Sequence, residues 1–181
     1  MYTEACERFN AAGIAQYEIS NFARPGHASR HNLKYWTRQP YAGFGLDAHS
    51  FLETMDGQAI RIGTTDDLTA YLDADKDCGA LEAITPVSET EALEEAWFLG
   101  LRLTEGVSLA AIEQQFGEEQ VRAFQPILLE GQQQRLLERE GRVVRLTQQG
   151  RLFANDVFSR FLGVAVTEGS VAPRQMEEQA A

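Results

Sequence analysis

Thr3–Ile19 reads TEACERFNAAGIAQYEI, and this stretch predicts the fold class of the N-terminal part of the chain. Its apolar residues recur at helical spacing as far as Ala12, and Gly13 occupies the position at which helices commonly end. The next residues, Ile14–Ile19, are typical of a short strand. A helix, a glycine stop and a strand make one α/β step, as in a parallel sheet or a partial barrel.

The loop after this strand leads into the residues that carry ligand chemistry. His31–Trp36 reads HNLKYW, which places one imidazole, one carboxamide and two adjacent aromatic rings within six residues. If the segment is helical, His31 and Tyr35 share one face, and Asn32 and Trp36 share the next. A nitrogen that binds iron, beside flat polarizable rings, suits a large planar ligand with a metal at its centre. In most proteins, however, a lone histidine is structural and a Tyr–Trp pair belongs to the core.

A window without acidic residues, Ile19–Leu46, surrounds this motif. Haem propionates are carboxylates, and arginine binds carboxylates through two parallel hydrogen bonds, so the window favours haem as the ligand. Haem iron is commonly held by histidine and sometimes by tyrosine, so His31 is the expected axial ligand and Tyr35 the second candidate. The cations expected to pair with the propionates are Arg24, Arg30, Lys34 and Arg38.

Other ligand classes fit this region less well. His27 and His31 are four residues apart, but a Pro-Gly pair just before them interrupts a helix, and nothing in the spacing requires His49 to join a zinc site. The sequence GFGLDAHS begins like a dinucleotide-binding loop, but no periodic helix follows it. We therefore expect Gly43 and Gly45 to let the backbone pass close to a bulky group, a ligand included.

Composition limits the function class. The chain has 181 residues, and no apolar run approaches the roughly 18 residues that span a bilayer. Its start lacks a signal-peptide pattern, so we expect a cytoplasmic protein. Cys6 and Cys78 lie far apart, which disfavours a disulfide framework and a cysteine-ligated metal. Residues 64–181 carry ten basic and twenty-one acidic side chains, and this excess of acid repels nucleic acid.

The C-terminal part reads as a linker followed by a second domain. Residues 64–87 are expected to form a linker with one short helix, whose Leu68 and Leu72 point inward. Ser88 and Glu91 form a capping-box pattern that opens a mostly helical, winged-helix-like domain at 88–163, and the aperiodic tail at 164–181 is expected to be disordered. The predicted strands after residue 40 lie within 40–52 and at 59–63 and 143–146. The predicted helices are 65–74, 88–103, 109–116 and 121–137, the last with a break or restart at Pro126. A closing helix is expected at 149–162, with Leu152, Phe153, Val157, Phe158 and Phe161 inward.

A winged-helix-like domain raises nucleic-acid binding as an alternative function. Such a domain needs a basic stripe along the helix or hairpin that meets the phosphates. Leu109–Phe116 contains neither lysine nor arginine, and Glu138 and Glu140 interrupt the arginines near the expected hairpin. We therefore expect no nucleic-acid partner.

Five segments, taken in order, resemble one known family. The chain resembles the C-terminal half of HemW-type haem chaperones, which are radical SAM proteins related to oxygen-independent coproporphyrinogen III oxidase. The resemblance runs from about residue 1 to residue 163, and the HNxxYW element is specific to this branch. The segments are YEISNFARPG at 17–26, RHNLKYW at 30–36, GFGLDAHS at 43–50, LGLRLTEGV at 99–107 and LTQQG at 146–150.

The resemblance implies a fold and a function. Residues 1–63 would be the last strands and helices of a partial (β/α) barrel, and residues 88–163 the family's helical C-terminal domain. Members hold haem and pass it to respiratory enzymes at the membrane, so the resemblance implies a haem chaperone that is not itself catalytic. The family motif implies that haem is contacted by His31, Asn32, Tyr35 and Trp36.

The resemblance also implies parts that this chain does not carry. The family holds a 4Fe–4S cluster through CxxxCxxC and binds S-adenosylmethionine, but two cysteines cannot hold that cluster, so the chain is expected to be a fragment or to have a mis-set start. The alternative is the C-terminal part of a coproporphyrinogen III oxidase-like enzyme, although Glu18, the only acid near the ligand window, receives no catalytic role. Ser29, Leu46 and Asp47 depart from the family pattern, and the sequence predicts no particular oligomeric state.

Overall fold

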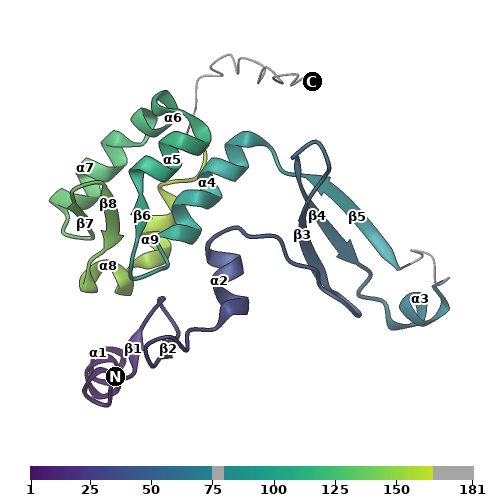
Figure 1. The fold of residues 1–181 in the computed structure, drawn as a ribbon, viewed down its shortest axis with the longest axis horizontal. Helices are drawn as coiled ribbons and strands as arrows, with labels where there is room; N and C mark the ends of the chain where they lie inside the picture. The colour runs from purple at the N-terminus through teal and green to yellow at the C-terminus, as the bar shows by residue number, and fades with distance from the viewer. Residues whose placement is uncertain (75–79, 165–181) are drawn as a thin grey trace, which may run out of the picture.

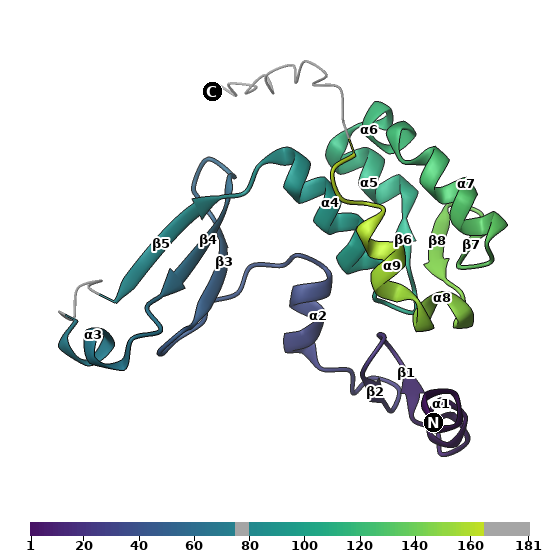
Figure 2. The same ribbon diagram turned by 180° about the vertical axis from the view of Figure 1, so that it is seen from behind.

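The computed structural model describes residues 1–74 and 80–164. A mostly helical part holds the C-terminal half of the described chain, and a three-stranded sheet projects beside it as an arm (Figure 1). The short helix α2 lies between these two parts, and the N-terminal helix lies beyond α2, as the reverse view also shows (Figure 2). The segment with the ligand chemistry therefore stands where the parts of the molecule meet.

The N-terminal part contains the expected helix, but its strands pair differently from the expectation. Helix α1 (Tyr2–Ala11) is followed by Gly13, whose φ of +73° is the left-handed conformation that ends many helices. Strand β1 (Ala15–Gln16) pairs antiparallel with β2 (Phe22–Ala23). The parallel pairing predicted from the α/β step is absent among the described strands. The chain turns back after only a few residues, whereas a parallel neighbour needs a crossover of about a dozen residues.

The arm is an antiparallel sheet in the order β3-β4-β5. Strands β3 (His49–Glu53) and β4 (Ala59–Thr64) agree with the prediction. The region expected to be a linker, 64–87, also contains a strand, β5 (Leu81–Pro86). This strand pairs with β4 and satisfies the backbone groups at the edge of β4. The short helix within that range is present as α3 (Leu68–Asp73).

The inward orientation predicted for Leu68 and Leu72 is wrong. Both side chains are exposed, because α3 lies at the far end of the arm, away from the helical part (Figure 1). An apolar residue at helical spacing reports a buried face only if another element packs there, and no described element covers these two leucines.

The helical part contains the core of the molecule. Trp97, Phe124 and Phe161 are fully buried, and their ring centroids lie 5.4 to 5.9 Å apart. A small antiparallel sheet in the order β6-β8-β7 packs with the helices, while the winged-helix resemblance stays a prediction. The elements are α4 (Glu89–Gly100), β6 (Val107–Ser108), α5 (Leu109–Phe116), α6 (Glu118–Ala123), α7 (Gln125–Gln133), β7 (Leu137–Glu140), β8 (Val143–Leu146), α8 (Gln148–Leu152) and α9 (Ala154–Ser159).

The break or restart predicted at Pro126 is confirmed, whereas the closing helix predicted as continuous is divided. The helix expected at 121–137 is divided at Phe124, and Pro126 opens α7 because proline lacks the N–H of a helix interior. The closing helix breaks at Phe153, which leaves Phe153 and Leu152 exposed instead of inward, whereas the other three predicted inward residues are buried. The prediction of a disordered tail falls on residues 165–181, which lie outside the described residues.

The capping box at the start of α4 is present and gives a stability prediction. The Ser88 hydroxyl accepts from the Glu91 amide at 3.2 Å, and the Glu91 carboxylate accepts from the Ser88 amide at 2.8 Å. We expect Ser88→Ala to lower the free energy of unfolding by about 1 kcal/mol, as measured by urea denaturation. Ser159→Ala, which removes a hydroxyl bonded to the backbone inside a helix, is the matched control.

The same cap has a defined pH dependence. Hydrogen bonds from the backbone and side chain of Ser88 lower the pKa of Glu91 in the folded state. A carboxylate whose pKa is lowered by folding stabilises the protein above its unfolded pKa, and this contribution is lost as the pH falls through the folded pKa. The cost of Ser88→Ala should therefore shrink in acid. An equal cost at neutral and acidic pH would contradict this account of the cap.

Candidate functional site

The HNLKYW segment is a helix, the conformation on which the predicted pairing of His31 with Tyr35 depended. Helix α2 (Arg30–Trp36) begins at Ser29, whose hydroxyl accepts from the Asn32 amide at 3.3 Å. Ser29 thus supplies an N-cap at the position where the sequence departs from the family pattern. A helix of this length presents its side chains at fixed spacing, so the ligand chemistry is carried on a defined surface rather than on a mobile loop.

His31 and Tyr35 form a hydrogen-bonded pair on one face of α2. The Tyr35 hydroxyl oxygen lies 3.0 Å from Nε2 of His31, and the two rings are nearly perpendicular, with centroids 4.9 Å apart. His31 is exposed, while Tyr35 is half-buried and packs on the ring of Tyr41 at 4.4 Å. The imidazole is therefore open to a ligand, and the phenol reaches inward from it.

Trp36, on the next face of α2, is fixed by a cation from the helical part. The Arg102 guanidinium lies over the indole ring, 4.1 Å from its centroid. The same guanidinium binds Glu18, with 3.3 Å between Nη2 and Oε2. Within the described residues, the buried Nε of Arg102 and Nε1 of Trp36 have no hydrogen-bond partner. One arginine thus holds α2 and the N-terminal part together.

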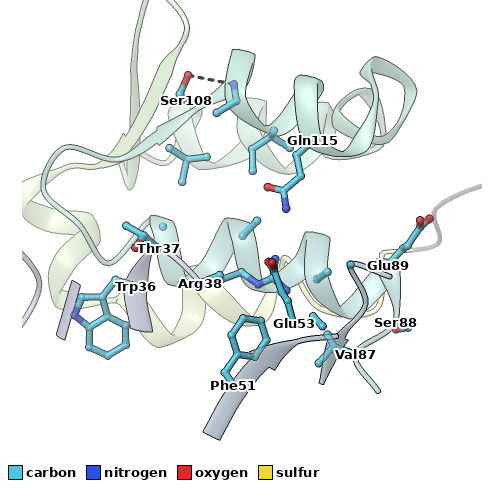
Figure 3. A pocket seen from close by; sticks show the side chains of 18 of the residues that line it. Trp36, Thr37, Arg38, Phe51, Glu53, Val87, Ser88, Glu89, Ser108 and Gln115 are labelled. Carbon is cyan, nitrogen blue, oxygen red and sulfur yellow. Dashed lines mark hydrogen bonds between the residues drawn. The ribbon is translucent and has the colours of Figure 1, made fainter. Parts of the chain in front are cut away.

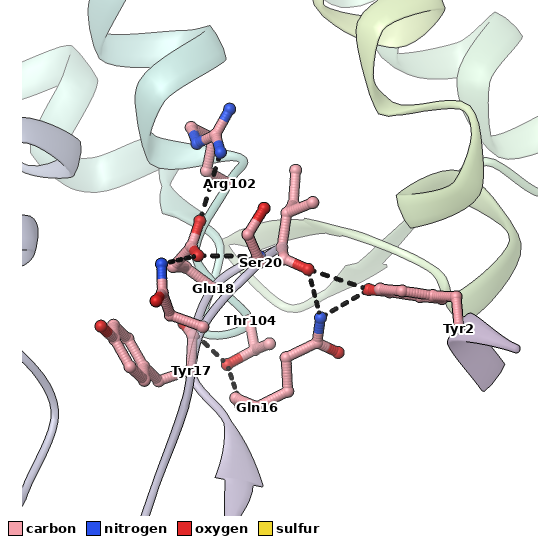
Figure 4. Close-up of polar contacts among 9 residues, drawn as sticks. Tyr2, Gln16, Tyr17, Glu18, Ser20, Arg102 and Thr104 are labelled. Atoms are coloured by element: carbon pink, nitrogen blue, oxygen red, sulfur yellow. Dashed lines mark hydrogen bonds and ion pairs between the residues drawn. The ribbon is translucent and has the colours of Figure 1, made fainter. Parts of the chain in front are cut away.

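Glu18 is the fully buried acid of this cluster, and Figure 4 shows how its oxygens are satisfied. Its Oε1 accepts from the Ser20 amide at 2.7 Å and from Nδ2 of Asn21 at 2.6 Å. The neighbouring backbone is docked as well, because the Ile19 amide donates to the Arg102 carbonyl at 3.1 Å. No role was predicted for Glu18, because its partner Arg102 lies 84 residues away along the chain.

Arg38, which was expected to meet a propionate, is held inside the protein. Its Nε lies 3.1 Å from Oε2 of Glu95, and the two side chains are only 10% and 13% exposed. Arg61 binds the same carboxylate from the arm, and the Arg38 guanidinium lies over the Phe51 ring at 5.4 Å. Arg38 therefore joins α4 to the arm instead of standing free for a ligand.

The other three predicted cations remain on the surface. Arg24, Arg30 and Lys34 are exposed, and none forms an ion pair within residues 1–74 and 80–164. The Lys34 ammonium donates to the backbone carbonyl of Pro40 at 3.1 Å but stays exposed. These three charges remain accessible to an anionic ligand.

A cavity of about 590 Å³ lies between α2, the arm and α4. Ligand pockets for small molecules commonly measure about 300 to 1,000 Å³. Glu95, Arg38 and Arg61 lie at its polar side, whereas His31 is not part of its lining. Burial raises the pKa of the Tyr41 hydroxyl in its wall. The aromatic and aliphatic walls come from Tyr35, Trp36, Tyr41, Phe51, Phe98 and Leu99.

A second cavity, of about 610 Å³, lies between α4, α5 and the base of the arm (Figure 3). Small residues of α4, among them Ala92 and Ala96, form its floor, and Glu53 and Glu89 contribute carboxylates. Arg38 lines both cavities and is bound to Glu95, but the first cavity also has Lys34, which forms no ion pair within the described residues. The second cavity, with its carboxylates and no lysine, is therefore less suited to an anionic ligand than the first one.

The two glycines of the predicted loop behave differently. A Cβ on Gly43 would lie 2.3 Å from the His49 carbonyl oxygen, so the predicted close approach is confirmed there, although it is to the chain's own backbone. No other part of the described chain lies within 4 Å of a Cβ on Gly45, so close approach there stays a prediction. Gly45 has a φ of +113°, a conformation that side chains rarely adopt.

The structure offers little support for a metal site or for nucleic-acid binding, two alternatives raised by the sequence. Within the described residues, no three His, Cys, Asp or Glu side chains gather as a metal site. Two of the arginines near the β7–β8 hairpin are bound to acids, Arg142 to Glu113 and Arg145 to both Glu138 and Glu140, and Arg139 donates to the Gly141 carbonyl.

No helix in the described part of the chain is both long enough and apolar enough to span a bilayer.

Comparison with known proteins gives a consistent set of relatives. Residues 87–153 match the family described as the HemN C-terminal domain. The chain is 37% identical over 164 residues to heme chaperone HemW of Bacillus subtilis (strain 168), which covers 90% of this chain and 42% of that protein. It is 39% identical over 112 residues to heme chaperone HemW of Synechocystis sp., over 61% of this chain and 26% of that protein. The chain thus spans less than half the length of these relatives.

One solved structure shares the fold. The coproporphyrinogen III oxidase HemN of Escherichia coli, a radical SAM enzyme, superposes with a TM-score of 0.62 over 88% of this chain and 39% of that one. The two sequences are 16% identical over this match, so the likeness shows the mixed α/β fold alone.

The buried pair gives a prediction about how the parts hold together. Removing one member of a buried ion pair leaves the other charge unsatisfied, so we expect Glu18→Gln to lower the free energy of unfolding by about 2 to 3 kcal/mol. Glu4→Gln is the matched control, because Glu4 and its partner Arg8 are both exposed and such pairs contribute little. Chemical denaturation measures both, and equal losses from the two variants would contradict a structural role for Glu18.

Proposed function

We propose that this chain, which is homologous to the C-terminal portion of the HemW-type haem chaperones, binds haem at α2 and holds it for transfer. The observation that carries the proposal is the His31–Tyr35 pair, an exposed donor set for iron beside an aromatic cavity. Asn32 and Trp36 complete the surface that the haem would contact.

The cavity and its surroundings fit a haem in three respects. Aromatic walls such as Trp36 suit a flat macrocycle, since stacked rings and apolar burial are favourable together. Histidine nitrogen and tyrosine oxygen are both axial ligands that haem iron accepts. The free cations Arg24, Arg30 and Lys34 are candidates to neutralise the propionates, whereas Arg38 is held by Glu95.

The proposed role is to hold haem and not to catalyse a reaction. Because His31 is exposed, a ligand can reach it and leave it without crossing the protein interior, which suits a chaperone that passes its cargo on. We include in the proposal a cytoplasmic location and a respiratory enzyme at the membrane as the receiver, both from the family resemblance. The CxxxCxxC motif contains three cysteines, and this chain has only Cys6 and Cys78. The 4Fe–4S cluster and S-adenosylmethionine are therefore not assigned to residues of this chain.

The enzyme alternative has weaker support. The likeness to coproporphyrinogen III oxidase is one of fold, and a shared fold does not carry a shared reaction. The one buried acid near the cavity region, Glu18, is bound to Arg102 and to neighbouring amides, so it is not placed as a proton donor. Haem holding is therefore the function that the geometry supports best.

Hemin titration of the full chain tests the proposal. We expect His31→Ala to weaken hemin binding by about ten-fold or more, which corresponds to at least about 1.4 kcal/mol, because the donor pair is broken. His27→Ala is the matched control, since His27 is also exposed and bonds only to the Pro25 carbonyl. A Soret spectrum and affinity unchanged by His31→Ala would contradict haem contact at α2.

The propionate assignment has a separate test. We expect Arg24→Ala combined with Arg30→Ala to weaken binding of hemin but not of hemin dimethyl ester, because only free carboxylates pair with arginine. Both titrations are followed at the Soret band. An equal loss with both porphyrins would show that the two arginines do not act through the propionates.

A further inference from the structure

We propose that the haem iron at this site is bound by the phenolate oxygen of Tyr35, with His31 as the hydrogen-bond partner of that oxygen rather than the ligand itself. This inference rests on the proposed function, since it assigns the donor atom for a haem held beside α2. It reverses the order of the two candidates that the sequence alone suggested.

The position of the cavity is the first reason. Tyr35 lines the aromatic cavity between α2, the arm and α4, whereas His31 does not. A macrocycle that stacks against Trp36 and Phe98 inside this space meets Tyr35 directly. His31 is not among the lining residues, and its Nε2 lies 3.0 Å from the Tyr35 hydroxyl.

The hydrogen bond is the second reason. Nε2 is the ring nitrogen of His31 that points away from the backbone, and it is occupied by Tyr35. Direct ligation through Nε2 would require this bond to break. Ligation through Tyr35 would keep the two side chains in contact, with Nε2 accepting the phenol proton in the tautomer that carries its own proton on Nδ1.

The ligation step balances without any change of oxidation state. The O–H bond of Tyr35 breaks and its proton passes to Nε2 of His31, while the phenolate oxygen forms a bond to ferric iron and the water bound there leaves. Anionic oxygen is a hard donor and ferric iron the harder of the two iron states, so the bond favours the ferric form. Reduction of the iron would weaken it, and this gives the site a route to release.

The second tyrosine of the cavity lacks this arrangement. Tyr41 packs against Tyr35, with ring centroids 4.4 Å apart. No histidine bonds to its hydroxyl within the described residues. Of the two phenols that line the cavity, only Tyr35 therefore has a proton acceptor in contact.

Absorption and resonance Raman spectra of the full chain with hemin test the assignment. Wild type is expected to show a phenolate-to-iron charge-transfer band, with phenolate modes enhanced on excitation in that band. Tyr35→Phe should abolish the band and the modes, whereas His31→Ala should keep them with weaker hemin binding. Tyr71→Phe, a tyrosine of α3 far from the cavity, is the matched control and should leave the spectrum unchanged.

Metal-free protoporphyrin IX separates this inference from the proposed function. It offers the same macrocycle without iron, so Tyr35→Phe should weaken its binding much less than it weakens the binding of hemin. If wild type binds neither hemin nor protoporphyrin, the proposed function fails and this inference with it. If hemin binds and its spectrum depends on His31 but survives Tyr35→Phe, the inference alone is overturned.

Reduction of the wild-type complex provides a measurement that needs no variant. Dithionite should lower the affinity for haem by about ten-fold or more, because the phenolate bond favours ferric iron. A ferrous complex as tight as the ferric one would overturn phenolate ligation. Circular dichroism of each variant confirms that spectra are compared between folded proteins.

Discussion

The buried ion pair between Glu18 and Arg102 is the interaction on which the arrangement of this molecule depends. A fully enclosed carboxylate is tolerated only when its oxygens find donors, and Glu18 has the guanidinium, the Ser20 amide and the Asn21 amide group. Because Glu18 belongs to the N-terminal part and Arg102 to the helical part, the pair sets how these parts meet. The Trp36 indole lies on the same guanidinium, so α2 is fixed by the same contact.

This arrangement creates the candidate site. The aromatic cavity takes one wall from α2, one from the arm and one from α4, so it depends on the parts being held together. Glu95 of α4 reinforces the junction by binding Arg38, just after α2, and Arg61 of the arm. The donor pair therefore stands on a helix supported from both sides, while His31 remains at the surface where cargo enters and leaves.

The sequence predicted features that depend on residues close by in the chain, and it missed features that depend on residues far apart in the chain. The capping box at Ser88, the glycine after α1 and the helix restart at Pro126 are signals within a few residues, and all three were predicted. Strand β5 is set by pairing with β4, an element farther back in the chain, which periodicity does not report. The residues of HNLKYW were identified, but the cavity beside them and the capture of Arg38 by Glu95 were not, since 57 residues separate that pair.

The structure of the hemin-loaded chain tests the central claim most directly. The account predicts density for the macrocycle between α2 and α4, with iron bonded to the Tyr35 oxygen and the His31 imidazole on the far side of that oxygen. A macrocycle located elsewhere on the chain, or an empty aromatic cavity with iron bonded to His31 at the surface, would contradict it.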